Sequence, residues 1–554
     1  MVTTPINKLN AITYIITMKY RLSLDHTNPE KIIRKFYIHK NSSYIIFPPN
    51  IDIIEFWHEN SESIDNIIFP SYIESIIMSY YFNQSLDKAN FPSNLRSLEF
   101  QSDFNQSLDN VTFPPNLKSL ELSYEFNQPL DKTNLPNTLE SIIFGSKFNQ
   151  SLDNVKLPNS LKSITFQEAF NQSLDVWGAT KKFPNLKSIS GGTIPNYTFI
   201  RNLSSLQKLQ IEHNFNQPIS NIHFPSNLKK LEFGDCFNQP LIDVTLPPNL
   251  QSLIFGYHFN QPLINVTLPP NLQSLKFGYN FNQPLIDITL PPNLQSLKFE
   301  SNFNQPLINV ILPPNLQSLK FGYHFNQPLI NVILPPNLQS LKFGYHFNQP
   351  LILPQNLQSL KFGYDFNQSL INVTLPKNLK SLTFDGKFNQ SLKNVILPPN
   401  LETLILHGHY NQSLEQVVLP QALQSLTLGD SYYESLEHVT FPRNLKHLTI
   451  DGEPESFSST ILPPTLQSIT FGSQFNEPLN NLPPNITHLT FNEIFHKHLT
   501  NLPSSIKQIK ITHDNFKNVH KLKIPYGCII LNDSNIQIYP TDNDYEIETE
   551  SDSD

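Results

Sequence analysis

The sequence predicts an all-β-rich solenoid in which about 22 units of 22 residues stack through a parallel sheet. F-N-Q triplets recur every 22 residues through much of the chain, for example at Phe281 and Phe303. Between them, apolar residues follow an L-x-x-L-x-F pattern, as at Leu294, Leu297 and Phe299. The alternation of apolar and polar residues at its end is typical of a short strand. One such unit cannot bury its apolar face alone, so neighbouring units must stack.

Each part of the unit has an expected place. The apolar side chains of one unit should point inward: Leu294, Leu297, Phe299, Phe303, Leu307 and Leu312. The column of Phe303 should form a continuous aromatic spine of offset or edge-on rings. We expect Asn304 to be buried in the turn, where its amide satisfies backbone groups, and glycines such as Gly322 to end the strand and start the turn. Pro291 and Pro292 predict an extended return segment on the convex side, and parallel strands require such a crossover.

The organisation along the chain follows from where the period holds. We predict an N-terminal cap over residues 1–40, with strands at Tyr14–Met18 and Phe36–His39. The repeats should fill residues 41–515, with one degenerate unit whose missing turn falls at Gly191–Tyr197. Residues 516–540 supply a C-terminal cap, and residues 541–554 form an acidic tail that should be disordered.

The repeated motifs resemble two known types. The L-x-x-L-x-F segment resembles the strand of a leucine-rich repeat, and F-N-Q-P/S-L at this period is more similar to the FNIP repeat family. That family occurs in social amoebae and in large amoeba-infecting viruses, and is often joined to an F-box. The resemblance implies a protein-interaction role and, through the F-box, a ubiquitin-ligase link. No L-P-x-E-like segment that would begin an F-box is visible here.

Composition and glycosylation sequons limit the classes of partner and the cellular compartment that we expect. The net charge is −8, whereas nucleic-acid binders are usually basic, and no apolar run approaches a membrane span. Cys236 and Cys528 cannot build a disulfide framework. The short apolar patch near the N-terminus lacks a cleavage site, so we expect no signal peptide. Seven asparagines of the Asn304 column stand in N-Q-S sequons, which a buried position would leave unused: Asn83, Asn105, Asn149, Asn171, Asn367, Asn389 and Asn411. We therefore expect a cytoplasmic or nuclear protein, in the host cytoplasm if it is viral, and not a secreted one.

Motifs for catalysis or cofactor binding are absent from the sequence. There is no phosphate-binding glycine loop, no H-E-x-x-H and no catalytic triad pattern. His258, His324 and His346 share one column, and stacking should bring the last two within about 5 Å. A tetrahedral metal set would need further ligands, of which Asp365 is one candidate, so we interpret these as surface histidines copied by duplication. We expect a non-enzyme without cofactor or metal.

Two columns on the exposed strand face are the candidate partner-binding residues. The lysine column consists of Lys276, Lys298, Lys320, Lys342 and Lys361. The tyrosine column beside it consists of Tyr257, Tyr279, Tyr323, Tyr345 and Tyr364. Duplication of near-identical units would also copy these residues, and lysines keep a flat sheet soluble, which is the alternative interpretation.

The sequence thus predicts a non-catalytic protein–protein interaction scaffold with an extended concave sheet, as a substrate receptor or host-protein binder. The partner should be a protein, with an acidic surface facing the lysines. The alternative is a nucleic-acid or polyanion binder that uses the lysines and stacking tyrosines. The net charge and the lack of arginine in the column make nucleic acid the weaker alternative.

Overall fold

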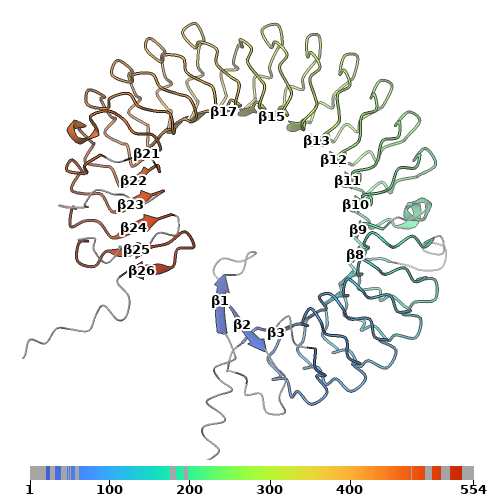
Figure 1. Ribbon diagram of the computed structural model, residues 1–554. Coiled ribbons are helices and arrows are strands. Elements are labelled where there is room, and N and C mark those ends of the chain that lie inside the picture. The colour runs from blue at the N-terminus through green and yellow to red at the C-terminus, as the bar shows by residue number, and fades with distance from the viewer. Residues whose placement is uncertain are drawn as a thin grey trace, which may run out of the picture. The chain divides into compact units, whose positions relative to one another are not determined.

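The computed structural model describes residues 20–24, 32–38, 47, 49, 51–56, 61–174, 183–192, 197–473, 475, 477–492, 502–512 and 524–539 (Figure 1). The chain divides into two compact units, Met1–Gly278 and Tyr279–Asp554. In each of them the short strands line the concave side and the return segments lie on the convex side (Figure 1). None of the helices in these described ranges has the length and apolar composition needed to cross a membrane.

Strands of three to seven residues make up both units. Unit 1 contains β1 (Tyr20–Leu24), β2 (Ile32–Ile38), β3 (Ile53–Phe56), β4 (Ser75–Ile77), β5 (Ser97–Glu99), β6 (Ser119–Glu121), β7 (Ser141–Ile143), β8 (Ser163–Thr165), β9 (Ser188–Ser190), the 3-10 helix η1 (Thr198–Asn202), β10 (Lys208–Gln210), β11 (Lys230–Glu232), β12 (Ser252–Ile254) and β13 (Ser274–Lys276). Unit 2 contains β14 (Ser296–Lys298), β15 (Ser318–Lys320), β16 (Ser340–Lys342), β17 (Ser359–Lys361), β18 (Ser381–Phe384), β19 (Thr403–Leu406), β20 (Ser425–Leu428), β21 (His447–Ile450), the 3-10 helix η2 (Phe457–Ser459), β22 (Ser468–Phe471), β23 (His488–Phe491), β24 (Gln508–Ile511), β25 (Ile529–Leu531) and β26 (Gln537–Tyr539).

Successive strands pair in parallel and in register, so that equivalent residues of neighbouring repeats lie side by side. Ser252 pairs with Ser274 in unit 1, and Ser318 pairs with Ser340 in unit 2. Antiparallel pairing occurs at the ends, between β1 and β2 and between β25 and β26. The predicted parallel solenoid of about 22-residue spacing is therefore confirmed. Of the strands expected in the N-terminal cap, Phe36–His39 overlaps β2, whereas Tyr14–Met18 lies outside the described residues.

The inward side chains form two interleaved aromatic columns with aliphatic residues around them. All six side chains predicted to point inward are buried, from Phe303 at 0% exposed to Leu312 at 7%. The Phe303 and Phe325 rings lie 6.0 Å apart at 3°, so the predicted spine is a series of near-parallel stacks. A second column joins it, because Phe299 stacks on Phe303 at 3.9 Å. Aromatic stacks of this kind contribute about 0.5–1.5 kcal/mol each beyond area burial.

In the degenerate repeat of unit 1, a 3-10 helix and Tyr197 take the place of the turn that carries the F-N-Q phenylalanine. Helix η1 follows Tyr197, whose ring packs edge-on against Phe215 at 5.2 Å. The Tyr197 hydroxyl donates to the carbonyl of Gly192 at 3.1 Å, so the buried phenol is hydrogen-bonded. Burial raises the pKa of Tyr197 above its ordinary value. The core thus continues through this unit although the F-N-Q motif does not.

Asparagines tie neighbouring turns together, but they are not buried as expected. The Asn304 side-chain oxygen accepts the Asn326 backbone N–H at 2.9 Å and the Gln327 amide at 3.1 Å. The predicted pairing with backbone is thus present, but it joins one turn to the next and leaves Asn304 half-exposed. Asn83 and Asn389, both in sequons, are exposed. The premise that burial blocks these sequons is therefore wrong. The asparagine side chains form hydrogen bonds to the next turn, but they are not buried.

A second asparagine column, in the return segments, also forms hydrogen bonds between turns. Asn315 donates its side-chain amide to the carbonyl of Pro292 at 3.0 Å, and Asn337 does the same with Pro314. The return segment is not simply extended, which corrects the expectation drawn from its prolines. It contains two tight turns, closed in one unit by Val310 N–H to Leu307 O at 3.0 Å and by Leu316 N–H to Pro313 O at 3.1 Å.

Glycine follows the strand because successive turns approach closely. A Cβ built on Gly344 would lie 1.7 Å from the carbonyl oxygen of Gly322, the equivalent residue one turn earlier. The backbone of Gly344 does not adopt the left-handed region. Glycine thus stands between the strand and the turn, as predicted, but what requires it there is close stacking between turns and not a left-handed backbone.

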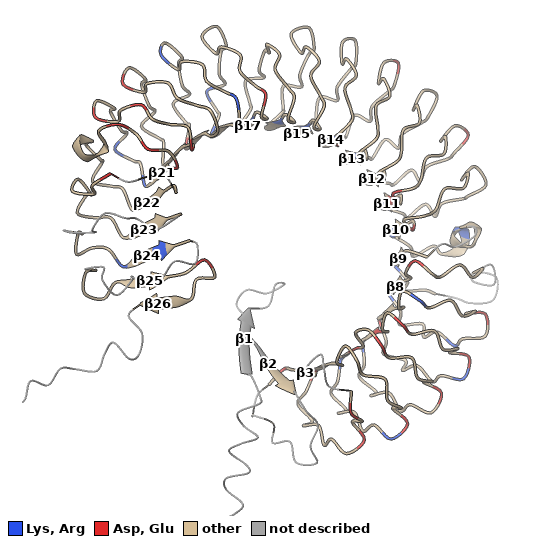
Figure 2. Cartoon of the chain, in the orientation of Figure 1, with Lys and Arg blue, Asp and Glu red and all other residues tan. Residues whose placement is uncertain are grey.

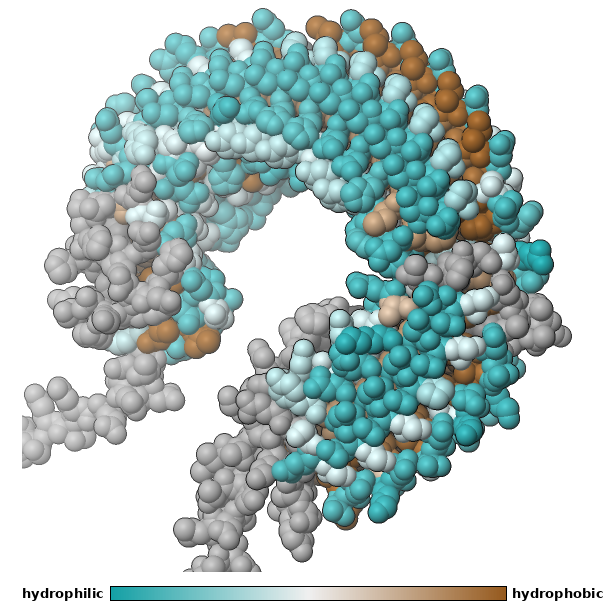
Figure 3. Space-filling model, turned by 45° about the vertical axis from the view of Figure 1, so that its right-hand side comes forward, coloured by the Kyte–Doolittle hydropathy of each residue, from teal (hydrophilic) through white to brown (hydrophobic). Residues whose placement is uncertain are grey.

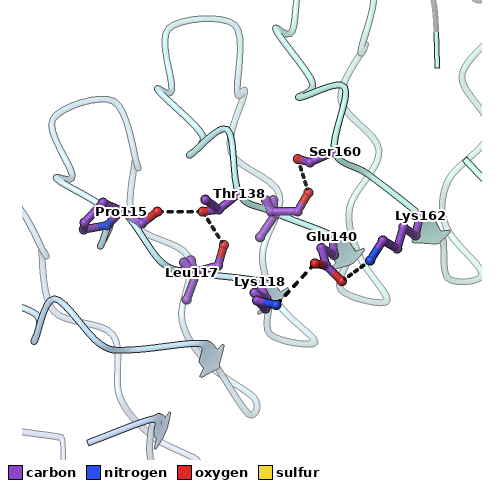
Figure 4. A network of polar contacts seen from close by, with 8 residues as sticks. Pro115, Leu117, Lys118, Thr138, Glu140, Ser160 and Lys162 are labelled. Atoms are coloured by element: carbon purple, nitrogen blue, oxygen red, sulfur yellow. Dashed lines mark hydrogen bonds and ion pairs between the residues drawn. The ribbon is translucent and has the colours of Figure 1, made fainter. Parts of the chain in front are cut away.

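Charged residues on adjacent turns of unit 1 pair with opposite charges (Figure 4). The Glu140 carboxylate lies 3.4 Å from Lys118 Nζ and 2.7 Å from Lys162 Nζ. The hydrogen bond from Lys162 is the main cause that holds the pKa of Glu140 below its ordinary value. Nearby, the Thr138 hydroxyl donates to the carbonyls of Pro115 and Leu117. Because the turns stack in register, Lys118, Glu140 and Lys162 stand side by side and their opposite charges compensate each other.

Candidate partner-binding surface

Unit 2 contains a column of like charges on its strand face. Lys298, Lys320, Lys342 and Lys361 are direct partners in the parallel register. Each follows a buried leucine, so strand alternation turns the lysines to the opposite face. Lys276 holds the same position on β13 of unit 1.

Carboxylates neutralise only the ends of this column in unit 2. Lys298 Nζ lies 2.6 Å from Glu300 Oε1 on its own chain segment, and Lys361 Nζ lies 2.9 Å from Asp385 Oδ2. In the part of the chain that the structure describes, neither Lys320 nor Lys342 forms a salt bridge. Partial burial lowers the pKa of Lys320, and the Lys298 charge lowers it further.

Tyrosines stand beside these lysines as a stack. The Tyr323 and Tyr345 rings lie 4.6 Å apart at 20°, and Tyr345 and Tyr364 lie 4.6 Å apart at 8°. Tyr323 is 45% exposed and Tyr279 is 41% exposed, so their rings are available to a partner. Tyr257, 42% exposed, occupies the same position in unit 1.

A shallow depression interrupts the tyrosine stack where Ser301 stands in place of a tyrosine. Its volume is about 600 Å³, and it opens between Tyr279 and Tyr323. Lys320 and Lys342 line one side of it, with Glu300 next to Ser301. Tyrosine, lysine and glutamate residues thus line a single hollow. Such a hollow suits a side chain of a bound polypeptide.

The histidine column is a surface feature. His324 and His346 stack at 5.3 Å, as predicted from the period. His346 Nδ1 contacts Asp365 Oδ2 at 2.6 Å, and Lys387 Nζ contacts the other carboxylate oxygen at 2.8 Å. Partial burial acts to raise the pKa of Asp365, but the hydrogen bonds from Lys387 and His346 outweigh it and hold this pKa below its ordinary value. No cluster of three or more histidine, cysteine or acidic residues that suits a metal ion occurs within the described residues.

The acidic residues of unit 1 (red in Figure 2) include glutamates at the same strand position on β5, β6 and β11. Glu99 and Glu121 are register partners on β5 and β6. Burial raises the pKa of Glu99, and the nearby Glu121 and Glu55 carboxylates raise it further. Burial likewise raises the pKa of Glu121. At this position β5 and β6 therefore present carboxylates, whereas β14 to β17 present ammonium groups.

A row of exposed isoleucines in the return segments was not predicted from the sequence. Hydrophobic residues gather in a band along the outer side of the return segments (Figure 3). In unit 2 the band includes Ile308, 47% exposed, Ile330, 50%, and Ile311, 84%. A signal was present, because the position of Ile308 is aspartate in early repeats, such as Asp109, and isoleucine in the central ones.

The repeats match the model of a known protein family over most of the chain. The model of the FNIP Repeat matches residues 60–103, 82–110, 104–147, 148–177, 184–236, 237–280, 281–324, 325–365, 366–409, 410–452 and 456–494. No curated protein sequence matches the chain.

Among solved structures, the giant-virus protein CroV588, a circular leucine-rich repeat protein, is 32% identical with a TM-score of 0.68, and the match covers 90% of this chain and 81% of that one. YopM from Yersinia enterocolitica is 18% identical with a TM-score of 0.38, covering 86% of this chain and 91% of that one.

Proposed function

The chain belongs to the FNIP repeat family, and we propose that it is a non-catalytic scaffold that binds a protein partner on the concave face of its sheet. A leucine-rich-repeat-like solenoid is a fold typical of protein-binding scaffolds. In-register strands repeat one set of side chains at the strand spacing of about 4.8 Å, which offers a partner a regular surface. The proposed role is that of a substrate receptor or of a binder of host proteins.

The observation that supports this proposal most directly is the pair Lys320 and Lys342. Two ammonium groups on adjacent strands repel each other, and in this pair no carboxylate of the described chain forms a salt bridge with them. The exposed rings of Tyr279 and Tyr323 flank them. Tyrosine supplies large contact area at interfaces, and lysines select an acidic partner. The surface therefore fits an acidic protein segment that carries at least one apolar or aromatic side chain.

Nucleic acid is the competing ligand, because stacked tyrosines beside lysines also suit unpaired bases. The net charge of −8 and the absence of arginine from the lysine column weigh against it. A single-stranded oligonucleotide labelled with a fluorophore separates the two ligands. Binding that falls steeply with salt and is lost in Lys320→Thr/Lys342→Thr would replace the protein-partner proposal.

The decisive experiment compares three forms of the chain as bait for affinity purification and mass spectrometry. They are the unchanged chain, Lys320→Thr/Lys342→Thr, and the control Lys377→Thr/Lys393→Thr, which removes two exposed lysines from return segments of the same unit. We expect a set of proteins that the first and third forms retain and the second loses. Ubiquitin-ligase subunits in that set would identify a substrate receptor. Identical sets for all three forms would refute the assignment of this surface.

A further inference from the structure

The last residues of the sequence have a regular acidic pattern. Aspartate or glutamate occupies every second position from Asp542 to Asp554, and the intervening residues are uncharged. In an extended strand, residues of the same parity point to one side at intervals of about 6.6–6.8 Å. When extended, this segment would therefore present all of its carboxylates on one face, with Tyr545, Ile547 and small polar residues on the other.

The lysine column of unit 2 is the complementary surface. Lys298 and Lys361 already form salt bridges with Glu300 and Asp385. A further carboxylate therefore contributes the most electrostatic binding free energy at Lys320 and Lys342. Lysine and carboxylate groups attract each other most when the lysines lack other partners and are partly shielded from water. Partial burial of Lys320, which lowers its pKa, marks such a position.

The reach of the segment favours its arrival from another molecule. Ten strand spacings separate β26 from β16, which is roughly 48 Å measured along the sheet. From Tyr539 to Asp554 the extended chain spans at most about 54 Å. Within one molecule, only the last acids would reach Lys342 along this path. A second copy brings the whole acidic face to the lysines.

We propose that the acidic segment 542–554 of one copy binds across Lys320 and Lys342 of a second copy. This contact joins different surfaces of the two molecules, so it is heterologous and leads to larger species as concentration rises. It depends on exposed charges and therefore weakens with salt. Resting on the proposed function, the same contact regulates it, because the segment and the acidic partner compete for the same two lysines.

Two measurements test the proposal. In the first, a fluorescent peptide of residues 541–554 is titrated with a full-length chain whose seven tail acids are changed to Asn or Gln. We expect saturable binding that Lys320→Thr/Lys342→Thr weakens at least about tenfold, while Lys377→Thr/Lys393→Thr changes it less than about twofold. A peptide of the same composition with its acids grouped together should bind several-fold more weakly, because its carboxylates no longer share one face.

The second measurement is sedimentation velocity of the unchanged chain from about 1 to about 100 µM at low and physiological salt. We expect growth to larger species at low salt, abolished by neutralising the tail acids and by Lys320→Thr/Lys342→Thr. A monomer throughout, or a peptide affinity that Lys320→Thr/Lys342→Thr leaves unchanged, would overturn the inference. The bait experiment described above measures the partner set without the peptide, so its outcome is separate from that of the peptide titration. If that set depends on the lysines and the peptide does not bind, only this inference fails.

Discussion

Asn304 allows a direct test of the contacts between turns. Its side-chain oxygen accepts the backbone N–H of Asn326 at 2.9 Å and the side-chain amide of Gln327 at 3.1 Å. Asn304→Ala removes this acceptor and leaves a half-buried backbone N–H without it. Such a loss costs about 1–3 kcal/mol, and we expect about 1–2 kcal/mol because Asn304 is only partly enclosed. Tenfold corresponds to about 1.4 kcal/mol, so local opening should increase roughly 5- to 30-fold.

Native-state hydrogen exchange reads out this effect at the Asn326 amide, with the denaturant midpoint of the full chain as the global measurement. Asn304→Asp keeps an acceptor oxygen and should retain most of the protection. The matched control is Asn315→Ala, which removes a donor to the exposed carbonyl of Pro292, a group that water can satisfy. Equal exchange rates at Asn326 in the Ala variants of both sites would refute the reasoning that the acceptor in the turn carries the contact.

Gly344→Ala should lower stability by more than about 2 kcal/mol, measured by denaturant titration, because the new Cβ would overlap a backbone carbonyl of the preceding turn. Glu99→Gln/Glu121→Gln should raise the denaturation midpoint at pH 7. Both folded pKa values are raised, so the parent loses stability as pH rises from the ordinary value near 4.5, and the advantage of the variant should vanish below that pH. Lys320→Thr/Lys342→Thr should leave the melting temperature unchanged or slightly higher, since it removes a repelling pair; a clear decrease would show that these lysines stabilise the fold.

Much of the fold is predictable from the sequence because its causes are local or periodic. Leu294 and Leu297 alternate with polar residues, and the 22-residue period alone places Phe303 over its neighbours. The return segment was harder to predict. Prolines restrict φ, but the turn here is closed by a hydrogen bond from Leu316 N–H to the Pro313 carbonyl, which the sequence motif alone does not predict.

Quantities set by the spacing between turns could not be predicted from one unit. The close approach at Gly344 and the half-exposure of Asn304 both depend on how tightly neighbouring units stack. The candidate surface shows the same limit. Its lysines were found from the period, but their different partners follow from Glu300 and Asp385, whose positions interrupt the repeat.

Both units contain ion pairs between adjacent turns, whereas Lys320 and Lys342 on adjacent strands carry like charges and form no salt bridge with a described residue, which supports a binding role for them. Glu140 is shared by lysines on both neighbouring turns, so the repeat architecture readily neutralises a charged column. Two charges about 5 Å apart in water interact by somewhat under 1 kcal/mol, so the pair Lys320 and Lys342 carries a small but avoidable penalty. Solubility does not require such a pair, because later strands carry partly exposed threonines at this position, such as Thr427 and Thr449. A ligand that supplies carboxylates converts this penalty into binding free energy, which is why the same substitution should spare the fold and remove the interaction.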